Sequence, residues 1–155
     1  MSTERSIRDL VLEHFATEDR KDVPGNLATF TDDCWYEIPA LGVSVRGKEA
    51  IGRHMTDLGR FFPDLVNLDP QIAVAGREVW VRTRVRRTHG QTWMGIEPTG
   101  RVIETTTVSY FRVADDGLFE CEVVYLDVPD LLFQLGLTAA PTGKAIVDRL
   151  VSRTQ

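Results

Sequence analysis

The sequence has few of the residues that mark metal-binding, disulfide-rich or membrane proteins. Its only cysteines are Cys34 and Cys121, which lie far apart and show no Cys/His spacing typical of a zinc site. We therefore expect no bound metal ion. We expect both cysteines to be free thiols, as in the reducing cytoplasm. No apolar run approaches the length of a bilayer span, and the polar residues after Met1 lead into an amphipathic segment. These absences predict a cytoplasmic protein with no signal peptide and no membrane partner.

Positive charge is also scarce. Lys and Arg number 18 against 23 Asp and Glu, which gives a net charge of -5 and a pI of about 5.2. With no basic field to attract phosphates, we expect no nucleic-acid partner. The one basic cluster is Arg82, Arg84, Arg86 and Arg87. Alternation places the first three of these on one face of a strand, which favours a solvated sheet face over a site for an anionic ligand.

The N-terminal third of the chain has the periodicity of helices. The 155 residues are 43% hydrophobic and 26% charged, which predicts one globular domain spanning residues 1–155. Apolar residues recur at helical spacing over residues 6–15, and a short helix fits residues 23–30. A strand at residues 34–38 and a loop at 41–47 precede a third amphipathic helix, which ends before Pro63.

Beyond Pro63 the pattern changes to strands. We predict strands at residues 66–74, 78–89, 102–113 and 118–127, separated by turns that contain glycine. A short apolar segment at 130–137 and a terminal helix at 143–153 follow. Helices followed by consecutive antiparallel strands predict an α+β fold rather than alternating βαβ units.

Three motifs, which occur along the chain in the order found in one known family, resemble the motifs of that family. Residues 89–101, His-Gly-Gln-Thr-Trp-Met-Gly-Ile-Glu-Pro-Thr-Gly-Arg, resemble the connection between two long strands of the SnoaL-like polyketide cyclases. Residues 127–136, which end in Gln-Leu-Gly, and the Phe-Pro-Asp-Leu stretch at 62–65 resemble two further motifs of the same family. The resemblance covers about residues 10–137. It implies a curved antiparallel sheet wrapped around a long helix, forming a cone with an internal pocket for a hydrophobic small molecule. It also implies a homodimer or higher homo-oligomer and a reaction without a cofactor.

The chain departs from the family at the residues that carry the chemistry. Aldol cyclases of this family keep an acid/base Asp and a His at positions that hold Val124 and Ser109 here. The base of the isomerase relatives corresponds to Ile38. The resemblance thus implies a pocket whose proton-transfer groups differ from those of its relatives.

We consider Asp127, His54 and His89 as candidate catalytic residues. Asp127 shares its strand parity with apolar residues, so it could end the strand inside the cone, or it could cap the following short helix. His89 shares the inward parity of its strand; the alternative is a histidine bonded to a backbone carbonyl at the turn. His54 lies on the apolar stripe of the third helix, where a structural role is the alternative.

A second group of candidates would contact the substrate. His14 lies among apolar residues of the first helix, and Glu122 has the inward parity of Val124. The alternatives are a structural core histidine and a surface carboxylate paired with an arginine on the neighbouring strand. Aromatic side chains could line the cavity, and a tyrosine hydroxyl could polarise a carbonyl. These aromatic candidates are Trp35, Tyr36, Trp93 and Tyr110.

The favoured hypothesis is an enzyme. We predict a cofactor-independent cyclase or isomerase that acts on a hydrophobic polyketide-like intermediate of secondary metabolism, such as antibiotic biosynthesis. It would act by acid/base assistance or by holding a flexible substrate in the shape needed for ring closure. The alternative is a non-catalytic module of the same fold that binds a small molecule or dimerises.

Overall fold

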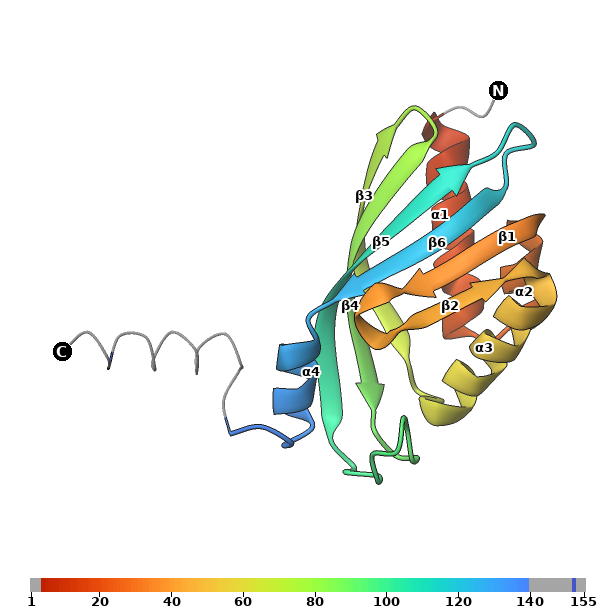
Figure 1. The fold of residues 1–155 in the computed structure, drawn as a ribbon. Coiled ribbons are helices and arrows are strands. Elements are labelled where there is room, and N and C mark those ends of the chain that lie inside the picture. Colours follow the sequence, from red (N-terminus) through yellow and green to blue (C-terminus); the bar gives the residue numbers. More distant parts are fainter. Residues whose placement is uncertain (1–3, 140–151, 153–155) are drawn as a thin grey trace.

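The computed structural model describes residues 4–139 and residue 152, and it combines helices with one curved, mostly antiparallel sheet (Figure 1). The helices are α1 (Glu4–Asp19), α2 (Val23–Ala28), α3 (Gly47–Phe61) and α4 (Val128–Gln134), with a 3-10 turn η1 (Pro39–Leu41). The strands are β1 (Phe30–Ile38), β2 (Val43–Arg46), β3 (Val66–Ala75), β4 (Glu78–Thr88), β5 (Val102–Val113) and β6 (Phe119–Leu126). The predicted α+β class is confirmed.

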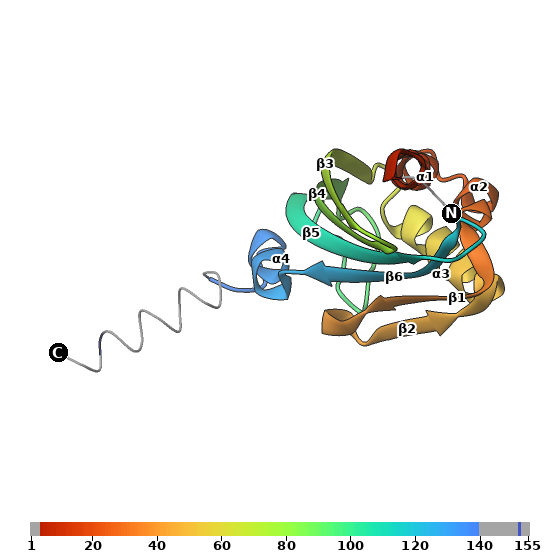
Figure 2. The ribbon, with the colours of Figure 1, turned by 90° about the horizontal axis from the view of Figure 1, so that it is seen from above.

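The strands form one curved sheet in the order β2-β1-β6-β5-β4-β3. All neighbouring strands are antiparallel except β1 and β6, which run parallel. Seen from above, the helices α1, α2 and α3 lie on the concave side of this sheet (Figure 2). This is the predicted cone, and its parallel pair places Tyr36 opposite Glu122.

The core lies between the concave face and the helices because both surfaces have apolar residues at the required period. Along β4 and β5 every second residue is buried, as the alternation of side chains in a strand requires. From α3, Ile51 and Met55 pack into the same core as Val79, Val81 and Phe111. Burial of each large apolar side chain contributes about 1.5–3 kcal/mol.

Some boundaries differ from the predictions. β1 begins at Phe30 rather than at residue 34, and the second helix ends at Ala28. The predicted loop at 41–47 contains β2, whose Val43 and Val45 are half-buried and pack against the core. Four residues are too few for the alternation to stand out in sequence. The helix predicted at 143–153 lies outside the described ranges. None of the described helices is long and apolar enough to cross a membrane.

Candidate functional site

A cavity of about 630 Å³, measured to include its opening to solvent, lies between the concave face of the sheet and the helices α1 and α3. Most of its lining is apolar, as in the binding sites of hydrophobic small molecules. The polar side chains that line it come from α1 and from strands β1 and β3 to β6. They are Glu18, Tyr36, Asn67, Arg87, Thr107, Ser109 and Glu122.

At one end of the cavity, Glu122 belongs to a buried network with His14, Thr29 and Ser109, which we call the inner network. His14 Nε2 lies 3.2 Å from Glu122 Oε2, and Ser109 Oγ donates to Glu122 Oε1 at 3.2 Å. The other ring nitrogen, Nδ1, lies 2.9 Å from Thr29 Oγ1. His14 is fully buried and Glu122 is only 4% exposed. The expectation of a surface carboxylate paired with an arginine is therefore wrong for Glu122.

The hydrogen bonds of the inner network indicate that one proton is shared between His14 and Glu122. Thr29 Oγ1 donates to the carbonyl of Asn26 at 2.6 Å, so it accepts from Nδ1–H of His14. Nε2 and the carboxyl group of Glu122 then need one further proton between them to form their bond. The pair is thus either imidazolium with carboxylate or imidazole with carboxylic acid.

Glu18 lies one helical turn beyond His14 on the same face of α1. Its carboxylate accepts a hydrogen bond from Asn67 Nδ2 at 2.9 Å. The pKa of Glu18 is raised to about 7, first by burial and then by the nearby Glu122, while His14 and the bond from Asn67 oppose the shift. A carboxyl group with this pKa exchanges a proton near neutral pH.

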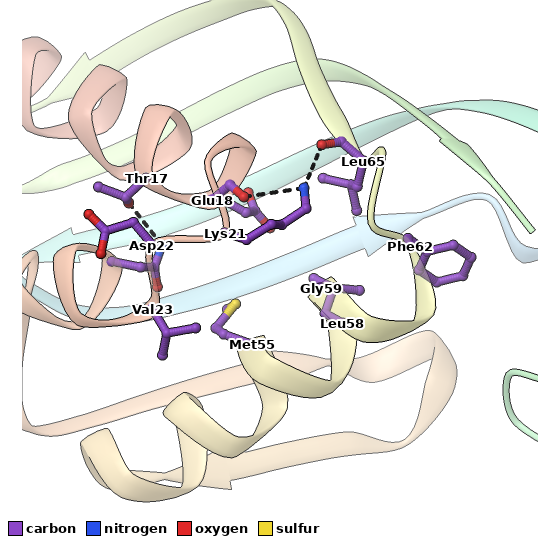
Figure 3. A pocket seen from close by; sticks show the side chains of 11 residues that line it. Thr17, Glu18, Lys21, Asp22, Val23, Met55, Leu58, Gly59, Phe62 and Leu65 are labelled. Atoms are coloured by element: carbon purple, nitrogen blue, oxygen red, sulfur yellow. Dashed lines mark hydrogen bonds between the residues drawn. The ribbon is translucent and has the colours of Figure 1, made fainter. Parts of the chain in front are cut away.

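A smaller hollow of about 300 Å³ lies on the other side of Glu18, between α1, α2 and α3 (Figure 3). It shares Glu18, Leu58, Phe62 and Leu65 with the cavity, so the Glu18 side chain lies between the two spaces. Lys21 also lines it, but the Nζ of Lys21 donates to the backbone carbonyls of Leu65 at 2.7 Å and of Glu18 at 3.4 Å (Figure 3). Lys21 therefore forms no ion pair with the Glu18 carboxylate.

Tyr36 offers a hydroxyl group beside Glu122. It is 4% exposed, lines the cavity, and its ring centroid lies 4.8 Å from that of His54. Burial, followed by the charges of Glu122 and Glu18, raises the pKa of Tyr36 well above its usual value. The hydroxyl group is therefore protonated at neutral pH and can donate to a carbonyl oxygen.

Asp127 does not reach the cavity. The residue is exposed, and its side chain accepts the backbone N–H of Asp130 at 3.0 Å as the N-cap of α4. Of the two alternatives for Asp127, the structure shows the helix cap. On β6 the cavity is lined by Glu122, Val124 and Leu126, so the alternate positions, whose parity Asp127 shares with Tyr125, point away from it.

The other two candidate catalytic residues lie behind the lining of the cavity. His54 is half-buried, burial lowers its pKa, and its Nε2 has no hydrogen-bond partner within the described residues. His89 is fully buried and its Nδ1 accepts the backbone N–H of Thr99 at 3.2 Å. The expected backbone partner of His89 is therefore an N–H group and not a carbonyl. Neither histidine contributes to the cavity lining.

Among the aromatic candidates, the structure brings Trp93 and Tyr36 to the cavity. Trp93 and Ile96 exchange backbone hydrogen bonds of 3.0 and 2.9 Å around Met94 and Gly95, whose φ angles of 49° and 77° form a tight turn. Within this turn the Trp93 ring packs on Phe62, with centroids 5.5 Å apart. The loop at residues 89–101 thus supplies one wall of the cavity.

Trp35 and Tyr110 lie on the opposite face of the sheet. Trp35 is half-buried, with the guanidinium carbons of Arg46 and Arg112 5.7 and 5.2 Å from its ring centroid. Tyr110 stacks on Trp80 at 4.8 Å. Side chains alternate along a strand, so Tyr36 and Ser109 take the inner positions next to them. Substrate contact by Trp35 or Tyr110 inside the cavity is therefore wrong.

Sequence reasoning did not single out Glu18 or place Arg87 in the site. Glu18 continues the helical stripe of Val11, His14 and Phe15, and Arg87 has the inward parity of Val85. Arg82, Arg84 and Arg86 do lie on the outer face, where Arg84 forms ion pairs with Asp69 and, at 2.7 Å, with Glu104. The solvated-face interpretation is confirmed for these three arginines, and Arg87 is the exception.

Comparisons with known proteins agree with the fold. A sequence model of the SnoaL-like domain matches residues 11–120. A proposed polyketide cyclase from Xanthomonas campestris has a similar structure, with a TM-score of 0.79, 18% identity, and coverage of 86% of this chain and 99% of that one. For AclR from Streptomyces galilaeus, a proposed hydroxylase, the TM-score is 0.75 and the sequence identity 24%, with coverage of 89% of each chain. For IdmH from Streptomyces antibioticus, a proposed polyketide cyclase, the TM-score is 0.72 and the sequence identity 24%. The match covers 84% of this chain and 98% of that one. No curated protein sequence matches the chain.

Proposed function

The chain belongs to the SnoaL-like domain family, and from this premise we propose that it is a cofactor-independent cyclase or isomerase acting on a hydrophobic, polyketide-like carbonyl compound. The observation that carries the proposal is the carboxyl group of Glu18, which lines a mostly apolar cavity and has its pKa raised to about 7. A base of this strength takes a proton from a carbon acid far better than an ordinary surface carboxylate does.

The proposed reaction begins with Glu18. Its carboxylate removes a proton from the carbon next to the substrate carbonyl, and the hydroxyl group of Tyr36 donates to the oxygen on which negative charge develops. In an isomerisation, the protonated Glu18 returns its proton to a different carbon. In a ring closure, the enolate carbon bonds to a second carbonyl carbon of the same molecule, and the new alkoxide needs a proton.

We propose that the pair of His14 and Glu122 supplies that proton. Glu122 lines the cavity while His14 lies behind it, so the carboxyl group is the member that meets the substrate. The proton on Glu18 then returns to the pair through water, which restores both groups. Ser109, at a position where relatives keep a histidine, holds Glu122 in place in this chain.

The remaining candidates receive supporting roles in this proposal. His54 packs on Tyr36 and would keep its ring in place. His89 binds the backbone of Thr99 and would fix the loop that carries Trp93. Asp127 would anchor α4. Proton transfer would therefore rest on the carboxyl groups in the cavity.

Isotope exchange tests the proposed base. We would incubate the protein with 2-tetralone, a bicyclic ketone, in D₂O and follow loss of the α-proton signals by NMR. Glu18→Gln should slow the protein-dependent exchange by about 10²–10⁴-fold, the usual contribution of a general base. Glu13→Gln, an exposed glutamate of the same helix, is the matched control and should leave the rate unchanged. If Glu18→Gln binds the ketone and exchanges it at the wild-type rate, the enzyme proposal fails and the non-catalytic binding module replaces it.

The proposal extends to the biological role, the compartment and the assembly of the protein. Relatives of similar structure from Streptomyces fit a role in secondary metabolism. The buried, free thiols of Cys34 and Cys121 fit a reducing compartment such as the cytoplasm. A homodimer is the assembly we expect, and light scattering would test it.

A further inference from the structure

One charged side chain in the cavity, Arg87, forms no ion pair within residues 4–139. The guanidinium group of Arg87 is on a residue that is only 7% exposed, and it lines the cavity. Within residues 4–139, its recorded polar contact is one bond from Nη1 to Thr105 Oγ1 at 3.2 Å. The ring of Phe62 lies under it, with 5.3 Å from the guanidinium carbon to the ring centroid. Most of the donors of this group are therefore unused by the described protein.

A buried cation without a counterion is costly. Burial lowers the pKa of Arg87 to about 10, while the charge of Glu18 partly offsets the shift, so the group stays protonated at neutral pH. Desolvating a charge costs several kcal/mol unless an opposite charge and hydrogen bonds compensate. Neither Thr105 nor Phe62 carries a negative charge, and no ion pair of Arg87 occurs among the described residues. Within residues 4–139 no anion pairs with this group, so an anionic ligand in the cavity would offset the cost.

The position of Arg87 defines where such a ligand would lie. Thr105, Thr107 and Ser109 project from β5 toward the concave side as a row of hydroxyl groups, and the last two line the cavity. Arg87 contacts Thr105 at one end of this row, and Glu122 contacts Ser109 at the other. Four residues of extended strand span about 13 Å. The guanidinium group of Arg87 and the pair of Glu122 and His14 thus lie at opposite ends of this row.

We propose that Arg87 binds an anionic group, most simply a carboxylate, on a hydrophobic substrate whose reacting carbonyl lies toward Glu122. A guanidinium group matches a carboxylate because two parallel N–H groups can bind its two oxygens. Phe62 and Trp93 then cover the apolar part next to the carboxylate. The placement of the reacting carbonyl rests on the proposed function; the anion site itself does not.

Binding of two matched probes tests the site. We would titrate the wild-type protein with 2-naphthoate, an anion, and with 2-naphthamide, its neutral counterpart, by isothermal titration calorimetry at pH 7.5. The wild type should bind the carboxylate about 10–100-fold more tightly, as expected for charge-assisted hydrogen bonds. Arg87→Met should abolish this preference and leave the affinity for the amide within about twofold. Arg86→Met removes an exposed arginine from the next position of the same strand and should change neither affinity.

Thermal unfolding without ligand separates a binding role from a structural one. If Arg87 serves a ligand, Arg87→Met relieves an uncompensated buried charge, and its Tm should equal or exceed that of the wild type. Arg87→Lys, which keeps the charge, should retain part of the preference for the carboxylate. Equal affinity of the wild type for both probes, no binding of either up to millimolar concentration, or a preference that survives in Arg87→Met would overturn the proposal. Glu18→Gln should keep the preference even though it loses exchange activity, so failure of the proposed function would be seen separately.

Discussion

The two ends of the cavity differ in how completely their charged groups are hydrogen-bonded. At the Glu122 end, the carboxyl group has a partner on each oxygen, and both ring nitrogens of His14 have partners. At the Arg87 end, a buried guanidinium group uses one donor toward a neutral hydroxyl group. A fully bonded buried network stabilises one arrangement, whereas unused donors lower stability until something binds them. We therefore propose positioning and proton supply for the Glu122 end and ligand recognition for the Arg87 end.

The largest effect on the free energy of unfolding is expected when the carboxyl group of the inner network is removed. Glu122→Ala leaves His14 and Ser109 buried without their partner and opens a cavity, so we expect the free energy of unfolding to fall by about 3–5 kcal/mol. Urea denaturation followed by circular dichroism measures this. A loss as small as that in Arg87→Met would mean that the two ends do not differ. In a double-mutant cycle with His14→Phe, the two losses should be less than additive.

Glu18 should make the free energy of unfolding depend on pH. A carboxyl group whose pKa rises from 4.5 to about 7 on folding binds a proton in the folded state between these pH values, while the unfolded chain does not. Stability from this group therefore falls as pH rises from about 4.5 to 7. We expect Glu18→Gln to be about 2 kcal/mol more stable than the wild type at pH 8 and nearly equal at pH 4.5. Urea denaturation at both pH values tests this, and a constant difference would contradict it.

Tyr36 tests whether a buried hydroxyl group acts in the reaction without holding the fold. Tyr36→Phe keeps the ring and its packing on His54, so the midpoint of urea unfolding should change little. The rate of exchange of 2-tetralone should fall about 10–100-fold, because the developing negative charge on oxygen loses its donor. A variant with the wild-type rate would remove Tyr36 from the proposed reaction.

The smallest effect is expected outside the cavity, at Asp127. Asp127→Ala removes the N-cap of α4 and should lower the free energy of unfolding by about 1 kcal/mol. The exchange rate and the preference for 2-naphthoate should both stay at wild-type values. A loss of exchange without a loss of stability would instead restore Asp127 as a proton-transfer group.

Local patterns in the sequence account for most of the fold. The long strands β4 and β5 alternate buried and exposed residues over nearly their whole length, so their class and inner face are readable from sequence. The strand β2 is too short to give such a signal. The parallel pairing of β1 with β6 joins segments that are far apart in the chain, and no local pattern encodes it.

The candidate site was less predictable because its members meet only through that long-range pairing. His14 and Glu122 each have an inward position in their own element, but their contact depends on the register of β6 against β5 and β1. Asp127 lies beyond the last strand residue, where helix capping decides its direction. Arg87 has the parity of buried valines, yet a charged residue there contradicts the usual rule that long charged side chains stay in water.

The bond between His14 and Glu122 joins residues that are 108 positions apart, which also constrains how the chain is made. A ribosome adds about 5–20 residues per second, so His14 leaves it roughly 5–20 s before its partner has been synthesised. During that interval α1 has no β6 to pack against, and its imidazole has no carboxyl group to bind. The central part of the site can therefore form only near the end of synthesis, and any truncation before β6 yields a chain that lacks it altogether.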